Sequence, residues 1–486
     1  MSMSESSRRE FLKAASTAGL ALFAPVPSLG LPGSGWRHVL WAPADSGDGW
    51  AEVDAILARI VPPRFPARDF NIAAFGAIGD GTKDCTAAVR EAIAACAAAG
   101  GGRVVVPAGT FLTGAIHLKS RVNLHLSAGA TLRFSRHPQD YLPVVFTRWE
   151  GVELMNYSAF IYAFEQENIA VTGPGTLDGN ASEVHWWPWK GRDPKAPDAP
   201  NQLAARARLI EMGAKGVPVA DRVFGEGSYL RPNFVQPYRC KNVLIDGITI
   251  VNSPMWELHP VLCSNVTIRN VTINSHGPNN DGCDPESCRD VLIEGCTFDT
   301  GDDCIALKSG RNEDGRRVNV PIENVVIRNC VMKDGHGGVV VGSEISGGAR
   351  NIFAEKCRMD SPQLDRALRI KTNSVRGGVT EHVYMRDVTV GQVAEAVVTI
   401  NYFYEEGDAG KFPPVVRDVE VRRVTAKKAQ YALLLRGYRH DPISDVRIVD
   451  CTFDDVEKPD VIEGVKDLAI TNTRVGGLLR NERISR

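Results

Sequence analysis

A short phrase that recurs from residue 168 onward constrains the fold of this chain more than any other feature. Each copy begins with a polar residue, continues as an alternating apolar run, reaches a Gly, Asn or Cys, and ends in a second short run. Clear copies cover residues 242–250, 265–273 and 290–298, and weaker ones begin at Asn168, Asn324, Asn351, His382, Asp418, Asp445 and Asp467. The copies recur at roughly 22 to 36 residues, a period typical of solenoids.

The alternation within each copy predicts two short strands, each with one face turned inward. A single copy cannot bury its apolar face alone, so consecutive copies must stack. The Leu-x-x-Leu frame of a leucine-rich repeat is missing, and a propeller would need about four strands per repeat. Because no crossover helices separate the runs, the pattern predicts an all-β chain folded as a right-handed parallel β-helix.

The residues before the repeats predict a cap for the open end of this solenoid. Asp84 is a suitable N-cap for an amphipathic helix that residues 100–102, three glycines, would end, and residues 103–107 then begin a strand. We therefore expect a β-helix domain over residues 69–480 with a short N-terminal capping helix, preceded by an extension over residues 31–68. An insertion at about residues 181–235 interrupts the repeats, and a connection this long is usually functional.

The first 30 residues are interpreted as a targeting signal rather than as part of the fold. Residues 7–13 read Ser-Arg-Arg-Glu-Phe-Leu-Lys and precede a weakly apolar run, which resembles a bacterial twin-arginine export signal. The alternative is a short cytosolic helix that begins with basic residues. Ser28-Leu29-Gly30 is the best cleavage site, so the mature chain would begin near Leu31. We expect an exported protein, periplasmic or secreted.

Composition excludes several functional classes. Lys and Arg number 56 against 58 Asp and Glu, so no broad field recruits nucleic acid or anionic lipid. Beyond the N-terminus, no apolar run is long enough to span a bilayer. The 11 cysteines are odd in number and recur beside the repeat, so we interpret most of them as buried small hydrophobes in stacked layers. No Cys and His spacing predicts a metal site, and we expect no cofactor.

Four short motifs fall at matching points of consecutive repeats. They read Asn279-Asn280-Asp281, Gly301-Asp302-Asp303, Gly335-His336-Gly337 and Arg369-Ile370-Lys371. Alone, each of the first three is ordinary turn chemistry. Polar residues at stacked corners align along one face of a solenoid, however, so the motifs should bring three carboxylates, an imidazole and two cations to one side.

This set of groups predicts acid–base chemistry on an anionic sugar. Three carboxylates in one groove repel one another, so one should retain its proton near neutrality while another stays ionised. Hydrolysis of a glycoside with inversion uses such a pair, about 6.5–9.5 Å apart, as general acid and as base for a water molecule. Arg369 and Lys371 alternate with Ile370 and share one strand face, which suits a uronate carboxylate.

The four motifs, in this order on a parallel β-helix, resemble the polygalacturonase family, glycoside hydrolase family 28. The resemblance covers about residues 69–475 and implies a hydrolase of α-1,4-linked galacturonate in pectic polysaccharides or oligogalacturonides. It implies Asp302 as the general acid, with Asp281 and Asp303 activating the water. It also implies that His336 supports the acid, that Arg369 and Lys371 hold the uronate carboxylate, and that Asn279 and Tyr404 contact substrate, Tyr402 competing for the last role.

Weaker features resemble bacterial exo-acting members of that family. They are the insertion itself, Gly342-Ser343-Glu344 and residues 371–378. The insertion carries Trp186, Trp187 and Trp189, which would either form a sugar-stacking wall or pack the loop against the solenoid. A stretch from Ser309 to Val320, longer than in the family, would reshape a wall of the groove.

Three alternatives remain open at the level of the sequence. A hydrolase of another pectic backbone, such as rhamnogalacturonan, would share the motifs. A pectate lyase also uses a β-helix with acidic residues, but it needs Ca²⁺ where this chain offers two cations. A non-catalytic polysaccharide-binding β-helix would not need an acid, a base and a cation pair together.

Overall fold

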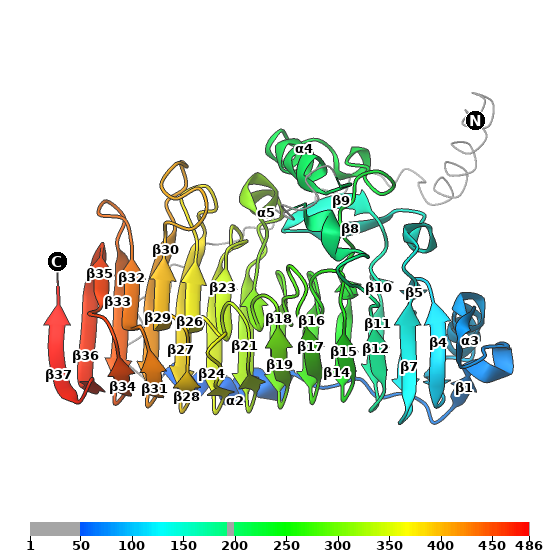
Figure 1. Cartoon of the computed structure of the whole chain (residues 1–486), viewed down its shortest axis with the longest axis horizontal. Helices are drawn as coiled ribbons and strands as arrows, with labels where there is room; N and C mark the ends of the chain where they lie inside the picture. Colours follow the sequence, from blue (N-terminus) through cyan, green and yellow to red (C-terminus); the bar gives the residue numbers. More distant parts are fainter. Residues whose placement is uncertain (1–48, 192–198, 486) are drawn as a thin grey trace, which may run out of the picture. The chain divides into compact units, whose positions relative to one another are not determined.

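The computed structural model describes residues 49–191 and 199–485 of the chain. The predicted export signal and its cleavage site lie outside these residues. Within them, short strands stack coil upon coil and pair in parallel with the strands of neighbouring coils (Figure 1). The predicted all-β parallel solenoid is thereby confirmed.

Three rows of strands run along the stack, and the first two belong to one 26-stranded sheet. The first row contains β1 (Asp69–Asn71), β3 (Gly102–Val106), β6 (Val122–Leu126), β11 (Glu167–Thr172), β14 (Lys241–Asp246), β16 (Ser264–Arg269), β18 (Arg289–Glu294), β21 (Ile322–Arg328), β24 (Ala349–Glu355), β27 (Val379–Arg386), β30 (Val415–Arg422), β33 (Ile443–Val449) and β36 (Val465–Val475). The second contains β2 (Asp80–Asp84), β4 (Gly109–Thr113), β7 (Ala130–Phe134), β12 (Thr176–Asp178), β15 (Thr249–Val251), β17 (Thr272–Ser275), β19 (Thr297–Thr300), β22 (Val331–Met332), β25 (Arg358–Met359), β28 (Thr389–Gln392), β31 (Thr425–Ala429) and β34 (Thr452–Val456). These two rows are the two strands that the repeated phrase predicts.

A third row completes most coils, and of its strands only the one that carries Arg369 and Lys371 was predicted. It contains β5 (Ile116–His117), β10 (Ile161–Phe164), β13 (Val235–Tyr238), β20 (Ile305–Leu307), β23 (Val339–Gly342), β26 (Arg366–Lys371), β29 (Ala396–Asn401), β32 (Tyr431–Arg436) and β35 (Val461–Glu463). Between β13 and β20, single bridges at Leu258 and Cys283 continue the row. This third row carries the polar motifs.

The polar residue that opens each copy of the phrase has a backbone reason. All ten opening residues have positive φ, between 50° and 58°, in the left-handed region that Asn and Asp tolerate better than most side chains. Their side chains also stack from coil to coil: the Asn242 amide donates to Asn168 Oδ1 at 2.9 Å, and the Asn265 amide donates to Asn242 Oδ1 at 2.7 Å. The turn and the ladder together explain why this position is Asn or Asp in nine of the ten copies, His382 being the tenth.

Both ends of the stack are covered. Helix α3 (Thr86–Ala98) buries Val89, Ala92 and Ile93 at the first coils. Its N-cap is Cys85, one residue after the predicted Asp84, and the Asp84 side chain accepts a hydrogen bond from the Thr86 backbone N–H at 2.8 Å. At the other end β37 (Leu478–Ile484) pairs antiparallel with β36. A shorter helix, α2 (Glu52–Arg59), is part of the N-terminal extension and packs against the outer side of β18, β21, β24 and β27.

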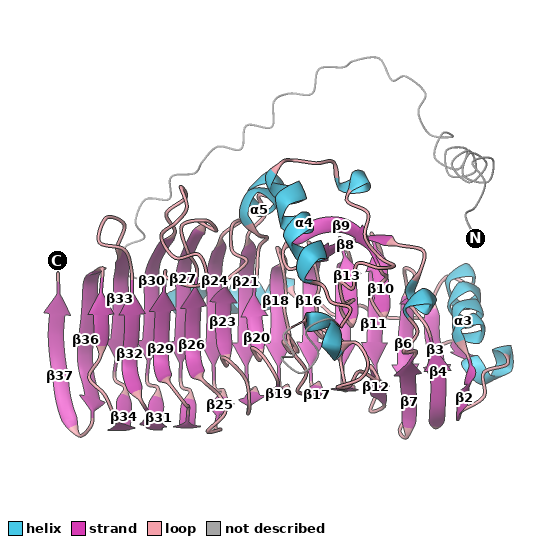
Figure 2. Cartoon of the chain, turned by 45° about the horizontal axis from the view of Figure 1, so that its top comes forward, coloured by secondary structure: helices cyan, strands magenta, loops and turns pink. Residues whose placement is uncertain are grey.

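The insertion folds into helices that lie above the middle coils (Figure 2). It contains η4 (Trp187–Lys190), α4 (Leu203–Ala214) and η5 (Val219–Asp221). A hairpin of β8 (Val145–Trp149) and β9 (Val152–Asn156) joins it, as does α5 (Asn312–Val318) in the predicted longer stretch. The hairpin was not predicted. Leu209 of α4 packs with Trp149 and Trp256 in a small core of its own, so the insertion is a built part of the molecule.

The tryptophans of the insertion serve packing. Trp186 is 2% exposed and lies in the main core, against Tyr141 and Phe160. The Trp187 indole donates to the Ser253 carbonyl oxygen at 2.8 Å. Trp189 contacts Trp186 and Tyr229, again through ring edges. Of the two sequence-based alternatives, packing of the loop against the solenoid is therefore the one observed.

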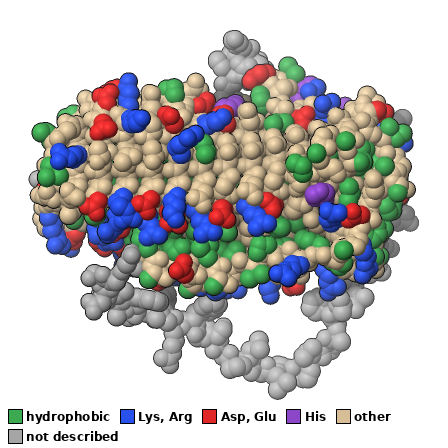
Figure 3. Space-filling model, turned by 90° about the horizontal axis from the view of Figure 1, so that it is seen from below, with side chains coloured by type: hydrophobic (Ala, Val, Ile, Leu, Met, Phe, Trp, Pro, Cys, Tyr) green, Lys and Arg blue, Asp and Glu red, His purple; other side chains and the backbone are tan. Residues whose placement is uncertain are grey.

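Charged side chains on the outside follow the coil register. On one face of the molecule, acidic and basic side chains alternate along rows parallel to the stack (Figure 3). Pairs such as Arg269–Asp246 at 2.9 Å and Arg328–Glu294 at 2.7 Å join neighbouring coils. Exposed pairs of this kind contribute little stability each, about 0–1 kcal/mol.

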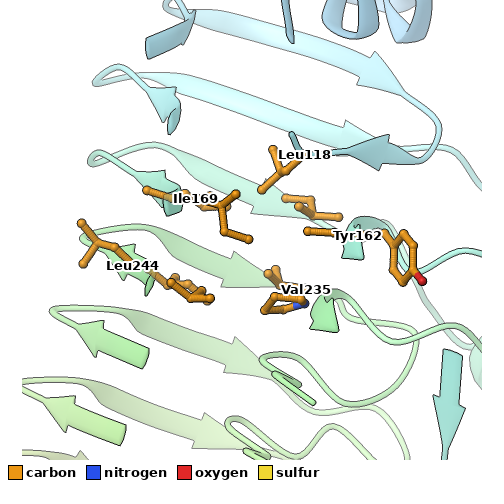
Figure 4. Close-up of a pocket in the computed structure, with 12 residues that line it drawn as sticks. Leu118, Tyr162, Ile169, Val235 and Leu244 are labelled. Carbon is orange, nitrogen blue, oxygen red and sulfur yellow. The ribbon is translucent and has the colours of Figure 1, made fainter. Parts of the chain in front are cut away.

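The interior of the solenoid is apolar and closely packed. Leu118, Ile169 and Val235 lie between the ribbon walls in the close-up of the first coils (Figure 4). The cavity there is about 10 Å³ and too small for a sugar. All 11 cysteines are buried and none forms a disulfide, which confirms their prediction as small hydrophobes. No helix in the described ranges is long and apolar enough to cross a membrane.

Candidate active site

The four motifs lie on adjacent coils because the register of the third row aligns them. Cys283, two residues after Asp281, forms a bridge with Ile305, two residues after Asp303. Strand β20 pairs with β23, and β23 pairs with β26, which holds Arg369 and Lys371. The motif around His336 immediately precedes β23. The sequence-predicted carboxylates, imidazole and cations are thus brought to one groove.

Gly335 allows the close approach of two of these coils. Its φ is 155°, and a Cβ there would lie 2.7 Å from the carbonyl oxygen of Asp302. A side chain at this position would push the coils apart. The glycine therefore sets His336 against Asp302, and the Gly-His-Gly pattern has a steric cause.

Asp281, Asp302 and Asp303 form a tight cluster. One carboxylate oxygen of each lies within 4.8 Å of one oxygen of each of the others. Asp281 and Asp303 are buried, whereas Asp302 is half-buried. Asp281 belongs to one coil and Asp302 and Asp303 to the next, so the spacing of stacked strands brings oxygens of the two coils together. A water molecule can donate hydrogen bonds to two carboxylate oxygens at this spacing.

Arg369 and Lys371 are paired with Asp303. Arg369 Nη1 donates to Asp303 Oδ1 at 3.2 Å, and Lys371 Nζ donates to Asp303 Oδ2 at 2.6 Å. Burial acts to lower the pKa of Lys371, but the surrounding negative groups, Asp303 first among them, together raise that pKa above its usual value. The sequence treated these cations as free for a uronate, whereas in the structure a bound carboxylate would share them with Asp303.

His336 and Asp302 form an ion pair at the open side of the cluster. His336 Nδ1 lies 2.9 Å from Asp302 Oδ1, and the imidazole is 52% exposed. The hydrogen bond to Asp302 raises the pKa of His336 to about 9. Burial acts to raise the pKa of Asp302, but the bond to His336 and its charge hold that pKa well below its usual value. In the free protein, therefore, the proton of this pair is on the imidazole.

The pKa of Asp281 is shifted in the direction opposite to that of Asp302. Burial, followed by the charge of Asp302, raises the pKa of Asp281 to about 8 although Lys308 counteracts the shift. Its Oδ2 is 3.5 Å from the Lys308 ammonium, and its Oδ1 is buried without a hydrogen-bond partner among the described residues. The expectation that one carboxyl of the cluster retains its proton near neutrality fits Asp281 rather than Asp302.

Asn279 and Tyr404 lie at the edges of the cluster. Asn279 Oδ1 accepts hydrogen bonds from Arg231 Nη2 at 2.8 Å and from Lys190, so two side chains of the insertion reach this residue. The ring of Tyr404 lies 5.3 Å from the Lys371 ammonium. Tyr402 is fully buried, and its hydroxyl oxygen accepts a hydrogen bond from the Val416 backbone N–H, so this side chain points into the core and not into the groove. The structure thus separates the two competing tyrosines.

A buried ionic network behind the cluster was not predicted. Lys308 and Glu344 pair at 3.5 Å, and Arg311 joins Glu344 to Glu150 of the β8–β9 turn and to Glu405 of the loop after β29. Lys308 follows an apolar strand five residues after Asp303, and that spacing is the only sequence signal for it. The network ties the insertion side of the groove to the coils that hold the three aspartates.

Two groups of potential metal ligands occur in the described ranges: the three aspartates, and His276 with Asp299 and Asp334. The aspartates are already faced by Arg369, Lys371 and Lys308. Asp299 is paired with His276 at 3.0 Å and with Lys333 at 3.6 Å. Side-chain cations therefore balance both groups, and we assign a metal to neither.

Comparison with known families identifies the class of protein that this fold and site define. The family model described as glycosyl hydrolases family 28 matches residues 225–472, which include all four motifs. A second model, described as rhamnogalacturonase A/epimerase, pectate lyase-like, matches residues 70–128 in the first coils. The chain belongs to glycosyl hydrolases family 28 and is a glycoside hydrolase.

Individual relatives show which members of the family this chain resembles. The structure of an exopolygalacturonase from Thermotoga maritima superposes with a TM-score of 0.86 at 45% identity, over 90% of this chain and 99% of that one. A probable polygalacturonase of Vitis vinifera is 28% identical over 401 residues, which are 79% of this chain and 74% of the relative. An exo-poly-alpha-D-galacturonosidase of Dickeya chrysanthemi is 28% identical over 384 residues, 74% of this chain and 62% of that relative.

Proposed function

We propose that this protein is an exo-acting polygalacturonase that hydrolyses α-1,4-linked galacturonate from the non-reducing end of pectic chains. The observation that carries the proposal is the meeting of three carboxylates, an imidazole and two cations in one groove of adjacent coils. Relatives named polygalacturonase, exopolygalacturonase and exo-poly-alpha-D-galacturonosidase support the substrate.

In the proposed mechanism, Asp302 protonates the leaving glycosidic oxygen. The hydrogen bond of 2.9 Å to His336 makes a proton available to Asp302, since the imidazole holds one at neutral pH. Asp281 and Asp303 bind the attacking water. One of these two carboxylates acts as the base and removes a proton from the water as its oxygen bonds to the anomeric carbon. Asp302→Asn is expected to lower turnover by at least about 10²–10⁴-fold, the usual contribution of general acid catalysis.

The cations suit a uronate carboxylate next to the cleaved bond. Arg369 and Lys371 are nearly buried, and desolvated cations bind carboxylates more strongly than exposed ones. Tyr404 lies close to both and would stack against the sugar ring. The same cations favour hydrolysis over elimination, because they take the place of the Ca²⁺ that a pectate lyase would need.

Exo-action is supported by the difference between the two ends of the groove. Before the catalytic coils, α4 packs on Trp256, whose ring contacts Lys308 beneath Asp281. Beyond them, an open groove of about 300 Å³ is lined by residues of β26, β29, β32 and β35, including Arg366, Tyr431 and Arg436. A polymer can extend over the second side, whereas the insertion stands at the first.

Analysis of early products from polygalacturonate tests both parts of the proposal. We expect mono- or digalacturonate, a slow fall in viscosity, new reducing ends and no absorbance from an unsaturated product. A ladder of mixed oligomers with a rapid fall in viscosity would replace exo- by endo-action. Ultraviolet absorbance would indicate a lyase, and activity on rhamnogalacturonan alone would indicate the other pectic backbone. Inactive Asp302→Asn protein is the control.

Stereochemistry gives a second test of the roles. If a water held by Asp281 and Asp303 attacks opposite the leaving oxygen, the anomeric centre inverts, and an α-linked substrate first releases the β anomer. Proton NMR during the first minutes distinguishes the anomers. Initial release of the α anomer would mean a covalent intermediate and would overturn the assigned roles of the aspartates.

Export by a twin-arginine pathway into the periplasm or medium of a bacterium is part of the same proposal. The motif in residues 7–13 supports it, and so do 11 buried thiols without disulfides, which suit a protein that folds before export. Fusion of residues 1–35 to a reporter that is active only outside the cytoplasm tests it. Arg8→Lys with Arg9→Lys should block export, and retained export would contradict the proposal.

A further inference from the structure

Lys308 lies directly behind the catalytic cluster and has no role in the mechanism described so far. It follows β20 and is 2% exposed. Its ammonium is 3.5 Å from Asp281 Oδ2, 3.5 Å from Glu344 Oε2 and 4.3 Å from the centroid of the Trp256 ring. A lysine at this depth is unfavourable unless it is paired, so its three partners define a built site.

The contact with Lys308 distinguishes the two oxygens of Asp281. Oδ2 faces the ammonium, whereas Oδ1 is buried and has no hydrogen-bond partner in the part of the chain that the structure describes. Unpaired buried carboxylate oxygens are costly and rare. Oδ1 is therefore the oxygen that remains to accept a hydrogen bond from a water molecule.

We propose that Lys308 is a positioning residue for Asp281: its ammonium holds the carboxyl group through Oδ2 and stabilises its ionised form, whose Oδ1 can then take the proton of the attacking water. The inference rests on the proposed function, in which Asp281 activates that water. Glu344 holds the ammonium from the other side and is itself paired with Arg311 at 3.5 Å. Lys308 does not contact substrate in this assignment.

Several other groups face this pair, and they set the background of its titration. Around Asp281 these are Asp302, Asp303, Lys371, Glu257, Asp284 and Arg231, and around Lys308 they include Asp284, Glu344, Asp303 and His259. His336 acts on Asp302. Among these cations, Lys308 is the one that forms an ion pair with Asp281.

Two substitutions shift the charge at Asp281 in opposite directions. Lys308→Met removes the ammonium, so the acidic limb of the kcat profile should move to higher pH, with about a tenfold loss per pH unit below the optimum. At the optimum, kcat should fall by up to about 10²-fold through misplacement, with little change in KM. Glu344→Gln leaves the ammonium to Asp281 alone, so the limb should move to lower pH. Lys308→Arg should retain the wild-type limb.

Lys333→Met is the matched control, since Lys333 pairs with Asp299 outside the cluster and is 53% exposed. Its profile should equal that of the wild type. The inference would be overturned if the acidic limb of Lys308→Met did not move, or if it moved equally in Lys308→Met and Glu344→Gln. It would also be overturned if Lys308→Met changed KM alone and left kcat unchanged. If Lys308→Met does not fold, Glu344→Gln and Lys308→Arg still decide it.

A measurement without substrate separates this inference from the proposed function. At pH 8, Lys308→Met should lower Tm more in the wild-type background than in the Asp281→Asn background, because in the second background the ammonium has no charge at residue 281 to balance. Equal losses in the two backgrounds would mean that the residues do not interact. This cycle remains informative even if the protein fails to hydrolyse polygalacturonate.

Discussion

Asp281 occupies a position that lowers the stability of the folded chain. Its carboxyl is buried, and its pKa is raised from 3.8 to about 8, first by burial and then by Asp302. A raised pKa in a carboxyl means that the folded state binds the proton more tightly than the unfolded state. The resulting penalty is absent below about pH 4, grows as the pH rises, and is complete above about pH 8.

Asp281→Asn is therefore expected to abolish activity and to stabilise the fold. At pH 8 the gain should be on the order of 1–4 kcal/mol, because an amide replaces a desolvated charge. Below pH 4 the difference from the wild type should vanish. Thermal unfolding followed at several pH values measures it. A variant that is less stable at pH 8 would show that Lys308 and the cluster already compensate the buried charge.

His336 should control the alkaline side of the activity profile. Its pKa is raised to about 9 by the bond to Asp302, so the imidazolium is present below that pH and is lost as the pH rises through it. We expect turnover to fall above about pH 9 and this limb to disappear in His336→Gln, whose kcat should be lower by about 10²-fold. His440→Gln, at an exposed histidine, is the control. An alkaline limb that persists in His336→Gln would assign it to another group.

The residues of the four motifs could be found from the sequence because each motif combines turn residues with groups of one chemistry. The pairing of Asp303 with Lys371 could not, because nothing in the sequence indicates that a buried aspartate shares the cations expected to bind substrate. Lys308 was missed for a related reason: a single lysine after an apolar run reads as a surface residue, and only the coil register places Asp281 and Glu344 beside it.

At the scale of elements, the first two strand rows were predictable, and the third was not, apart from the strand that carries Arg369 and Lys371. Strands of these two rows, such as β17, can alternate exposed and buried residues along their length. Strand β23 is buried at all four residues and β20 at all three, because the loops and helices above the groove cover their outer face. Period-two alternation is then lost. The β8–β9 hairpin was missed similarly, since its outer residues Arg148 and Glu153 are buried by ion pairs.

Helix α4 should be an integral part of the fold, and one pair of leucines tests this. Leu209 is fully buried against Trp149 and Trp256, whereas Leu203 in the same helix is 47% exposed. Leu209→Ala should cost about 2–5 kcal/mol and loosen the insertion, and Leu203→Ala should change little. Limited proteolysis near residues 192–215 and thermal unfolding report the two effects. If the insertion closes one end of the groove, Leu209→Ala should also release longer oligomers.

At the scale of the whole molecule, the ends of the stack are its vulnerable part, because only there can a strand have an unpaired edge. Every inner coil pairs with two neighbours, but β36 would present a free edge without β37. A chain that ends after Gly477 should therefore associate edge to edge, visible as light scattering or early elution. Leu479→Lys, at a half-exposed position of β37, keeps the strand and should stay unchanged. A monomeric truncated chain would show that β36 protects itself.

The open groove over β26, β29, β32 and β35 has a consequence for how such a molecule can change over generations. Each coil there adds about 4.8 Å of floor and contacts only the coils beside it. A coil could be duplicated or lost beyond β29 without moving Asp281, Asp302 or Asp303. Evolution can therefore change the number of sugar units bound beyond the cleaved bond without changing the chemistry that cleaves it.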